Sequence, residues 1–172
     1  MATHLRNFSK DQNRTLKDVE KIKVAIITAN WHQEITNALT DGAFQKLLEH
    51  GILSDNILQV EVPGAFELPQ ACKMVLSHKN VQAVICLGCV IKGETNHDEY
   101  INHAVAHGLT GLSIASGKPV IFGVLTTLTY EQAVDRSTGK LGNKGEECAV
   151  AAINMLVLQQ ELTKTETKIG FS

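Results

Sequence analysis

Four apolar runs constrain the fold of this chain more than any other feature. They are rich in valine and isoleucine, and they are nearly continuous rather than alternating with polar residues: IKVAIITAN (22–30), NILQVEV (56–62), VQAVICLG (81–88) and PVIFGVL (119–125). Uninterrupted apolar strands are typical of a parallel sheet that is covered on both faces. None of the runs approaches the roughly 18 residues of a membrane-spanning helix, so we expect no membrane partner.

Segments with helical periodicity lie between these runs. Residues 35–50 place Ile35, Leu39, Ala43 and Leu47 on one face, and residues 98–116 do the same with Ile101, Val105, Leu109 and Leu112. Alternating strands and helices predict an α/β fold with right-handed crossovers. We therefore expect a three-layer sandwich, with a parallel four-stranded sheet between helices, and a ligand site beyond the carboxyl ends of the strands.

Two more helices are expected near the end of the chain. Thr129 to Gln132 has the pattern of a capping box and predicts a short helix over 129–136. The last helix, about 145–165, has a stripe of Cys148, Ala151, Met155, Leu158 and Leu162, but Val150, Ile153, Leu156 and Val157 make it apolar almost all round. It is either enclosed within the domain or covered by another subunit. The second is favoured, because large exposed apolar patches are rare on monomers.

Length and charge narrow the classes of function. The 172 residues predict one domain over 21–172, preceded by a polar, aperiodic arm over 1–20. With 16 basic and 18 acidic residues and no basic stripe, a nucleic-acid partner is not expected. The N-terminus lacks the apolar stretch of a signal peptide, and the four cysteines lie in apolar segments, so we expect a cytoplasmic protein with reduced thiols.

Unusual residues follow the predicted strands. Trp31 is the only tryptophan, Phe66 and Glu67 follow the second run, KGETNH follows the third, and the fourth carries Phe122. With eight aromatic residues in the chain (one Trp, two Tyr and five Phe), three near strand ends could stack on a planar ligand or simply close the core.

Two segments could bind phosphate. GETNH is expected at a helix start, where free backbone amides and the helix dipole favour an anion. The glycine-containing loop DRSTGKLGNKG carries Arg136, Lys140 and Lys144, which could contact phosphate or form only a solvated charged loop.

Three interpretations compete for His97. It could transfer protons, since histidine titrates near neutral pH, or it could be a structural residue at the helix start. A zinc site with His103, His107, Cys86 and Cys89 is disfavoured. On a helix His97 lies roughly 80–120° from the other two histidines, and cysteines three apart on a strand point to opposite faces. No metal is expected.

Four ordered motifs resemble one family, the 6,7-dimethyl-8-ribityllumazine synthases. They are VPGAFELP (62–69), LGCVIKGETNH (87–97), PVIFGVLTT (119–127) and DRSTGKLGNKGEECAVAAI (135–153), within a match that covers most of residues 22–158. The resemblance implies a flavodoxin-like sandwich that condenses 5-amino-6-(D-ribitylamino)uracil with 3,4-dihydroxy-2-butanone 4-phosphate and releases phosphate and water. It implies no metal and no organic cofactor.

The resemblance also implies roles for individual residues. Trp31 and Phe122 would contact the pyrimidine ring, Ala65, Phe66 and Glu67 the ring and the ribityl chain, and Cys89, Val90 and Ile91 the heterocycle through backbone groups. Glu94, Thr95 and Arg136 would bind phosphate, His97 would move protons, and Lys144 would support the same pocket. Many family members have phenylalanine in place of Trp31 and arginine in place of Asn30. These differences would preserve stacking and remove one charge near the ring.

Assembly is a further implication of the resemblance. Family members form pentamers whose sites are shared between neighbours, and some build shells of twelve pentamers, which are associated with a short turn between the last two helices. The spacing from Arg136 to GNKG (142–145) keeps that short turn. We therefore expect a pentamer and a sixty-subunit shell, with riboflavin synthase suggested as a partner. The alternative is a non-catalytic, shell-forming relative that binds a flavin or lumazine.

Overall fold

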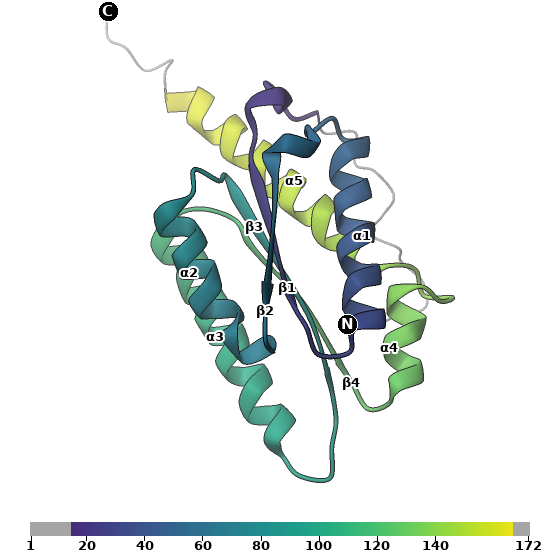
Figure 1. Ribbon diagram of the computed structural model, residues 1–172. Helices are drawn as coiled ribbons and strands as arrows, with labels where there is room; N and C mark the ends of the chain where they lie inside the picture. The colour runs from purple at the N-terminus through teal and green to yellow at the C-terminus, as the bar shows by residue number, and fades with distance from the viewer. Residues whose placement is uncertain (1–14, 167–172) are drawn as a thin grey trace, which may run out of the picture.

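Four parallel strands form the central sheet of the computed structural model, which describes residues 15–166. In chain order they are β1 (Val24–Ala29), β2 (Ile57–Val62), β3 (Ala83–Ile91) and β4 (Val120–Thr127). Their spatial order is β2-β1-β3-β4, with every pair parallel (Figure 1). This is the beginning of the flavodoxin-like order 2-1-3-4-5, so the predicted fold class is confirmed.

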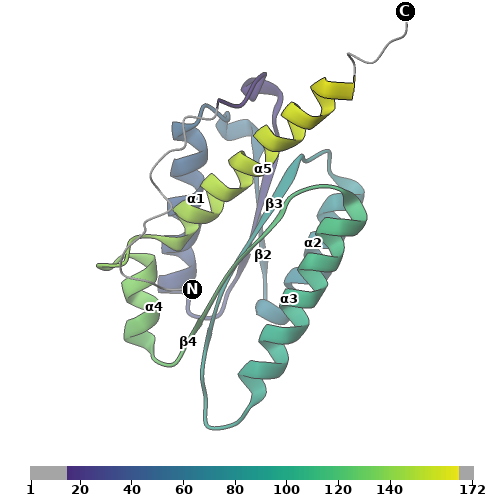
Figure 2. The same ribbon diagram turned by 180° about the vertical axis from the view of Figure 1, so that it is seen from behind.

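Helices cover both faces of the sheet. The helices are α1 (Gln33–Glu49), α2 (Leu68–His78), α3 (His97–Ser116), α4 (Tyr130–Ser137) and α5 (Lys144–Glu166). Helices α1, α4 and α5 lie on one face, and α2 and α3 lie on the other (Figures 1 and 2). The core is accordingly divided by the sheet into two clusters. Cys86 belongs to one cluster and Cys89 to the other, which confirms that they point to opposite faces.

The two edge strands are less buried than the sequence predicted. All six residues of β1 are buried, but Gln59 and Glu61 of β2 are exposed, as are Phe122 and Thr126 of β4. Continuous burial on both faces is therefore correct for the central strand β1 and wrong for the edges. The reason is that a strand at the margin of a twisted sheet has a neighbour on one side only.

Helix α5 is oriented differently from its predicted stripe. Its buried side comprises Cys148, Ala149, Val150, Ala152, Ile153, Leu156 and Val157. Of the predicted stripe, Cys148 is buried and Ala151 is half-buried, whereas Met155, Leu158 and Leu162 are exposed. Periodicity cannot choose the inner face of a helix that is apolar almost all round. The small residues face inward because α5 packs closely against α1.

Part of the segment assigned to an N-terminal arm packs on the domain. Leu16 is buried with the α1–α5 cluster, and the backbone of Lys17 forms two hydrogen bonds with the Gln160 side chain, at 3.0 and 2.9 Å. Residues 1–14 of the predicted arm lie outside the described residues. No helix in the described part of the chain is both long and apolar enough to cross a membrane.

Candidate active site at the carboxyl edge of the sheet

Trp31 and Glu67 come together where β1 and β2 end. Trp31 directly precedes His32, the N-cap of α1, and Glu67 closes a 3-10 turn, Ala65–Glu67, that leads into α2. Both side chains approach Gly64: a Cβ at that position would lie 3.1 Å from Glu67 Oε2 and 3.3 Å from Trp31 Cδ1. An indole ring and a carboxylate are therefore neighbours at this edge.

The aromatic side chains at this edge do not close the core. Trp31 is 69% exposed and Phe66 is 56% exposed. Apolar side chains of this size are normally buried, so two exposed rings beside a carboxylate indicate a binding surface. Ala65, between Phe66 and Gly64 in the chain, is buried and anchors the turn.

Strand β3 offers a backbone edge beside this surface. Its pairing with β1 is described as far as Thr28 opposite Leu87, whereas its pairing with β4 continues to Ile91 opposite Thr127. Cys89, Val90 and Ile91 therefore extend past the end of β1, with no described pairing on that side. The strand order changes direction between β1 and β3, which is where ligands bind in open α/β sheets.

The turn after β3 projects beyond the ends of β1 and β2 (Figure 1). Residues 92–97, which include Glu94 and Thr95, are exposed, and His97 is the first residue of α3. The N-cap Asn96 makes no side-chain cap bond, so the first amides of α3 are not capped in this way. Lys92 Nζ lies 3.9 Å from Asp98 and 3.6 Å from Glu99 and ties the two ends of the turn together.

The remaining predicted residues form a second group. Phe122, Arg136 and Lys144 line a shallow groove of about 690 Å³ between β4 and helices α4 and α5. Neither Trp31 nor His97 lines that groove. Arg136 donates to the Gln132 carbonyl oxygen at 2.8 Å, and Lys144 Nζ contacts both carboxylate oxygens of Glu147 at 2.7 Å.

Phe122 does not lie at a strand end as predicted. It is the third residue of β4, opposite Cys86 in the sheet register, and its ring is 41% exposed. The predicted run covered 119–125, whereas β4 continues through Thr126 to Thr127, so Phe122 lies farther from the carboxyl end of the strand than expected. One chain thus carries two separate groups of predicted residues, one at the carboxyl edge and one along β4.

Four residues near the carboxyl edge were not singled out by the sequence. His32 lies next to Trp31, and Tyr130 lies next to His32. Glu34 accepts a hydrogen bond from Tyr130, and Lys92 pairs with the first turn of α3. Tyr130 lies within the predicted capping box, Thr129 to Gln132. Its contacts with His32 and Glu34 join segments far apart in the chain, so no local pattern could predict them.

No metal-binding group forms in the part of the chain that the structure describes. Among residues 15–166, no group of three or more His, Cys, Asp or Glu residues could hold an ion. His107 Nδ1 lies 3.0 Å from the His103 carbonyl oxygen, within its own helix. Burial raises the pKa of Cys89 to about 11 and that of Cys148 to about 12, so both thiols stay protonated at neutral pH.

The fold and this edge define a class: a flavodoxin-like α/β protein with its candidate ligand site at the switch point of a parallel sheet. The sequence model of the 6,7-dimethyl-8-ribityllumazine synthase family matches residues 21–160. The chain therefore belongs to that family, whose members are transferase enzymes of riboflavin biosynthesis.

Similar proteins carry the same name. The 6,7-dimethyl-8-ribityllumazine synthase of Cytophaga hutchinsonii is 52% identical over 76% of this chain and 82% of its own length. The protein of that name from Phocaeicola vulgatus is 39% identical over 96% of this chain and 99% of its own. The one from Porphyromonas gingivalis is 43% identical over 93% and 99%.

Proposed function

We propose that this chain condenses 5-amino-6-(D-ribitylamino)uracil with 3,4-dihydroxy-2-butanone 4-phosphate to give 6,7-dimethyl-8-ribityllumazine, phosphate and water. Membership of the family supports the reaction. The observation that carries the site assignment is the meeting of Trp31 and Glu67 over Gly64, beside the extended end of β3. A planar pyrimidine with a polyhydroxyl chain needs an aromatic face and a hydrogen-bond acceptor side by side.

Each substrate part has a matching surface in this proposal. The pyrimidine stacks on Trp31 and Phe66, Glu67 accepts from the ribityl hydroxyls, and the backbone of Cys89–Ile91 reads the ring edge. The phosphate sits on the amides of the turn at Glu94 and Thr95. The Glu94 side chain is negative, so backbone groups and not this carboxylate must hold the anion.

His97 is the proton-transfer residue in this proposal. Imine formation, phosphate elimination and ring closure all move protons, and His97 stands at the phosphate turn as the first residue of α3. Holding two substrates in contact supplies much of the rate. No cofactor takes part in these steps.

The two separated groups support a site shared between subunits. Phe122, Arg136 and Lys144 of one chain would complete the carboxyl edge of its neighbour, with Arg136 pairing with the phosphate in a bidentate contact. The exposed Met155, Leu158 and Leu162 would be covered in the same assembly. A pentamer would both complete the carboxyl edge and cover the exposed apolar residues of α5.

A sixty-subunit shell belongs to the same proposal. Residues 138–143 alone connect α4 to α5, which is the short turn expected of shell-forming members. Riboflavin synthase is the proposed partner, because it would use the lumazine. Four buried free cysteines support a reducing, cytoplasmic location.

The test is turnover with both substrates, followed by lumazine fluorescence and by free phosphate. His97→Ala is expected to lower kcat about a hundredfold or more while lumazine still binds. His78→Ala, at the exposed end of α2, is the matched control and should retain full activity. Tight lumazine binding without phosphate release above the spontaneous rate would instead identify a non-catalytic relative.

A further inference from the structure

His32 stands between two aromatic rings at the carboxyl edge. Its ring centroid is 6.5 Å from that of Trp31, with an interplanar angle of 61°, and 6.3 Å from that of Tyr130, with an angle of 60°. Both are edge-to-face arrangements, the geometry that aromatic pairs favour. Trp31 is thus the outer member of a row of three rings.

The backbone of His32 is held firmly. Its φ of 59° and ψ of 55° lie in the left-handed region, where histidine is more frequent than most residues. Its carbonyl oxygen accepts from the amides of Ile35 at 2.9 Å and Thr36 at 3.0 Å. These bonds begin α1, so the helix sets the direction in which the His32 ring projects.

Tyr130 is anchored from two sides. Its hydroxyl donates to Glu34 Oε2 at 2.7 Å, a bond that also raises the pKa of the phenol and keeps it protonated. Tyr130 is the first residue of α4, whose N-cap Thr129 accepts from the Gln132 amide at 3.3 Å. Tyr130, the last ring of the row, is therefore held by α4, to which it belongs, and by Glu34 of α1.

Trp31 itself has little else to hold it. Its indole Cδ1 lies 3.3 Å from where a Cβ on Gly64 would be, but 69% of the residue is exposed within one chain. An exposed side chain ordinarily changes rotamer on the picosecond to nanosecond timescale. A ring that moves in this way is a poor surface for stacking, because each binding event must first immobilise it.

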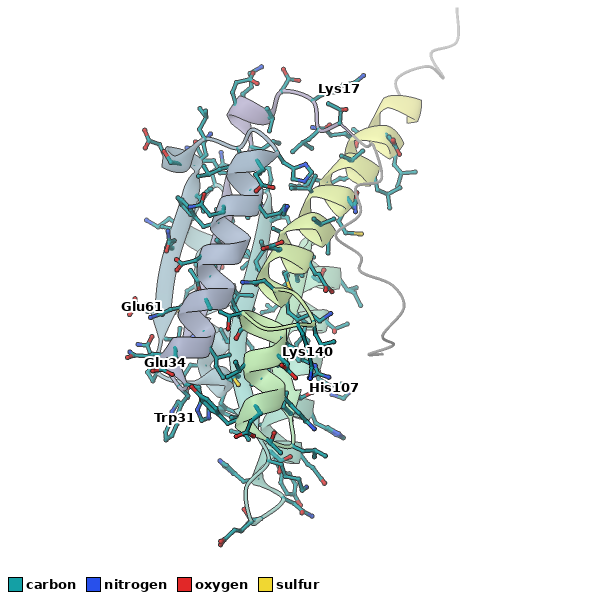
Figure 3. All side chains as sticks on the ribbon, turned by 90° about the vertical axis from the view of Figure 1, so that its right-hand side faces the viewer. Lys17, Trp31, Glu34, Glu61, His107 and Lys140 are labelled. Carbon is teal, nitrogen blue, oxygen red and sulfur yellow. The ribbon has the colours of Figure 1, made fainter. Side chains whose placement is uncertain are left out.

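We propose that His32 and Tyr130 are positioning residues that hold the Trp31 indole in the orientation in which it stacks on the pyrimidine, with Glu34 locking Tyr130. This proposal rests on the proposed stacking role of Trp31. Neither His32 nor Tyr130 needs to touch the substrate, because both act through the tryptophan. Figure 3 shows Trp31 and Glu34 on the same side of the view, in the half of the molecule away from Lys17.

Fluorescence tests the positioning directly, since Trp31 is the only tryptophan and its emission reports on this ring alone. His32→Asn keeps a residue that tolerates the left-handed backbone and removes the ring, and Tyr130→Ala removes the next ring. Both variants are expected to increase the fast component of the anisotropy decay of Trp31. Tyr130→Phe, which loses only the bond to Glu34, should have a smaller effect in the same direction.

Matched controls exist on other helices. Tyr100→Ala removes the only other tyrosine, an exposed residue of α3, and His78→Asn changes an exposed histidine of α2. Neither should alter the anisotropy decay. A purely structural link between α1 and α4 would change the free energy of unfolding in the His32 and Tyr130 variants without changing the motion of Trp31. That result would overturn the proposal.

Steady-state kinetics supply the second readout. His32→Asn and Tyr130→Ala are expected to raise KM for the pyrimidine substrate about two- to tenfold with kcat nearly unchanged, because stacking is lost equally from ground and transition states. An unchanged KM in these folded variants would overturn the proposal. Trp31→Ala separates the two claims: if it leaves KM unchanged, the stacking role of Trp31 fails, whereas a raised KM with no effect of His32→Asn refutes the positioning alone.

Discussion

Gly64 shows how a single residue shapes the candidate site. Its φ of −151° is extended backbone that any residue can adopt, so conformation does not require glycine here. The space around Gly64 favours glycine, because Glu67 Oε2 and Trp31 Cδ1 would lie only 3.1 and 3.3 Å from a Cβ at this position. The missing side chain lets an aromatic face and a carboxylate approach each other.

Gly64→Ala is therefore expected to displace Trp31 or Glu67. A Cβ at 3.1 Å from the carboxylate oxygen forces a neighbour to move by a few tenths of an ångström. Both neighbours are exposed side chains and can yield, so KM for the pyrimidine should rise severalfold while the free energy of unfolding falls by less than about 1 kcal/mol. Kinetics and urea unfolding check this. Gly111→Ala, where a Cβ meets nothing within 4 Å, is the control.

The buried thiols should make the free energy of unfolding fall at alkaline pH. The pKa of Cys89 is raised from 9.0 to about 11, and that of Cys148 to about 12, by burial. Because the folded state holds these protons more tightly, their contribution to stability is complete below pH 9. It is lost as pH rises from 9 toward 11 and 12.

Urea unfolding at pH 8 and pH 10 measures this effect, and the free energy of unfolding should be lower at pH 10. The double variant Cys89→Ala/Cys148→Ala should lose less stability over the same interval, although its cavities lower stability at both pH values. An equal loss in the two proteins would mean that these thiols do not cause the pH dependence.

At the scale of elements, the start of α5 docks closely on α1. The Asn143 side chain donates to the Ala38 carbonyl oxygen at 2.7 Å and accepts from the Gly145 amide at 2.7 Å. A Cβ at Gly145 would overlap the carbonyl group of Leu39. The GNKG segment therefore joins two helices, in addition to placing Lys144 beside Glu147.

Gly145→Ala should destabilise the whole domain. The obstacle is backbone of a buried helix and cannot move aside, so we expect a loss of about 1–3 kcal/mol. The free energy of unfolding from urea denaturation measures it. Gly93→Ala, at an exposed turn with no atom within 4 Å, should change this free energy by less than about 0.5 kcal/mol. Similar values for the two variants would contradict the close docking.

At the scale of the whole molecule, the predicted site residues of one chain lie in two separate groups. Trp31, Glu67 and His97 lie at the carboxyl edge, while Arg136 lines the groove along β4. The shared site that we propose would account for one chain holding both groups without bringing them together. The exposed apolar side of α5 extends the same surface.

Assembly should therefore be required for activity. Light scattering is expected to give at least five times the mass of the 18.7 kDa chain. Met155→Glu places a charge on the exposed face of α5 and should lower both the assembled mass and the turnover, with the circular dichroism spectrum unchanged. A fully active species at the mass of one chain would refute the shared site.

The sequence predicted the sheet correctly because its signals are local, and the same kind of local signal led to the proposed site residues, which stay a prediction. Continuous apolar runs identified the four strands, and the ordered motifs identified the family that the comparison later confirmed. The orientation of α5 and the exposure of β2 and β4 were wrong, since both depend on which neighbour covers which face.

Sequence alone determined the fold class and the family, because period, composition and motif order are properties of neighbouring residues; the segments that would supply chemistry stay a prediction. Only the tertiary structure decided which segments meet. It set Trp31 against Glu67, placed His32 and Tyr130 behind the tryptophan, and separated Phe122 from both. Contacts between residues far apart in the chain, such as Tyr130 with Glu34 at a separation of 96 positions, depend on how helices pack on a sheet, and no local pattern records that.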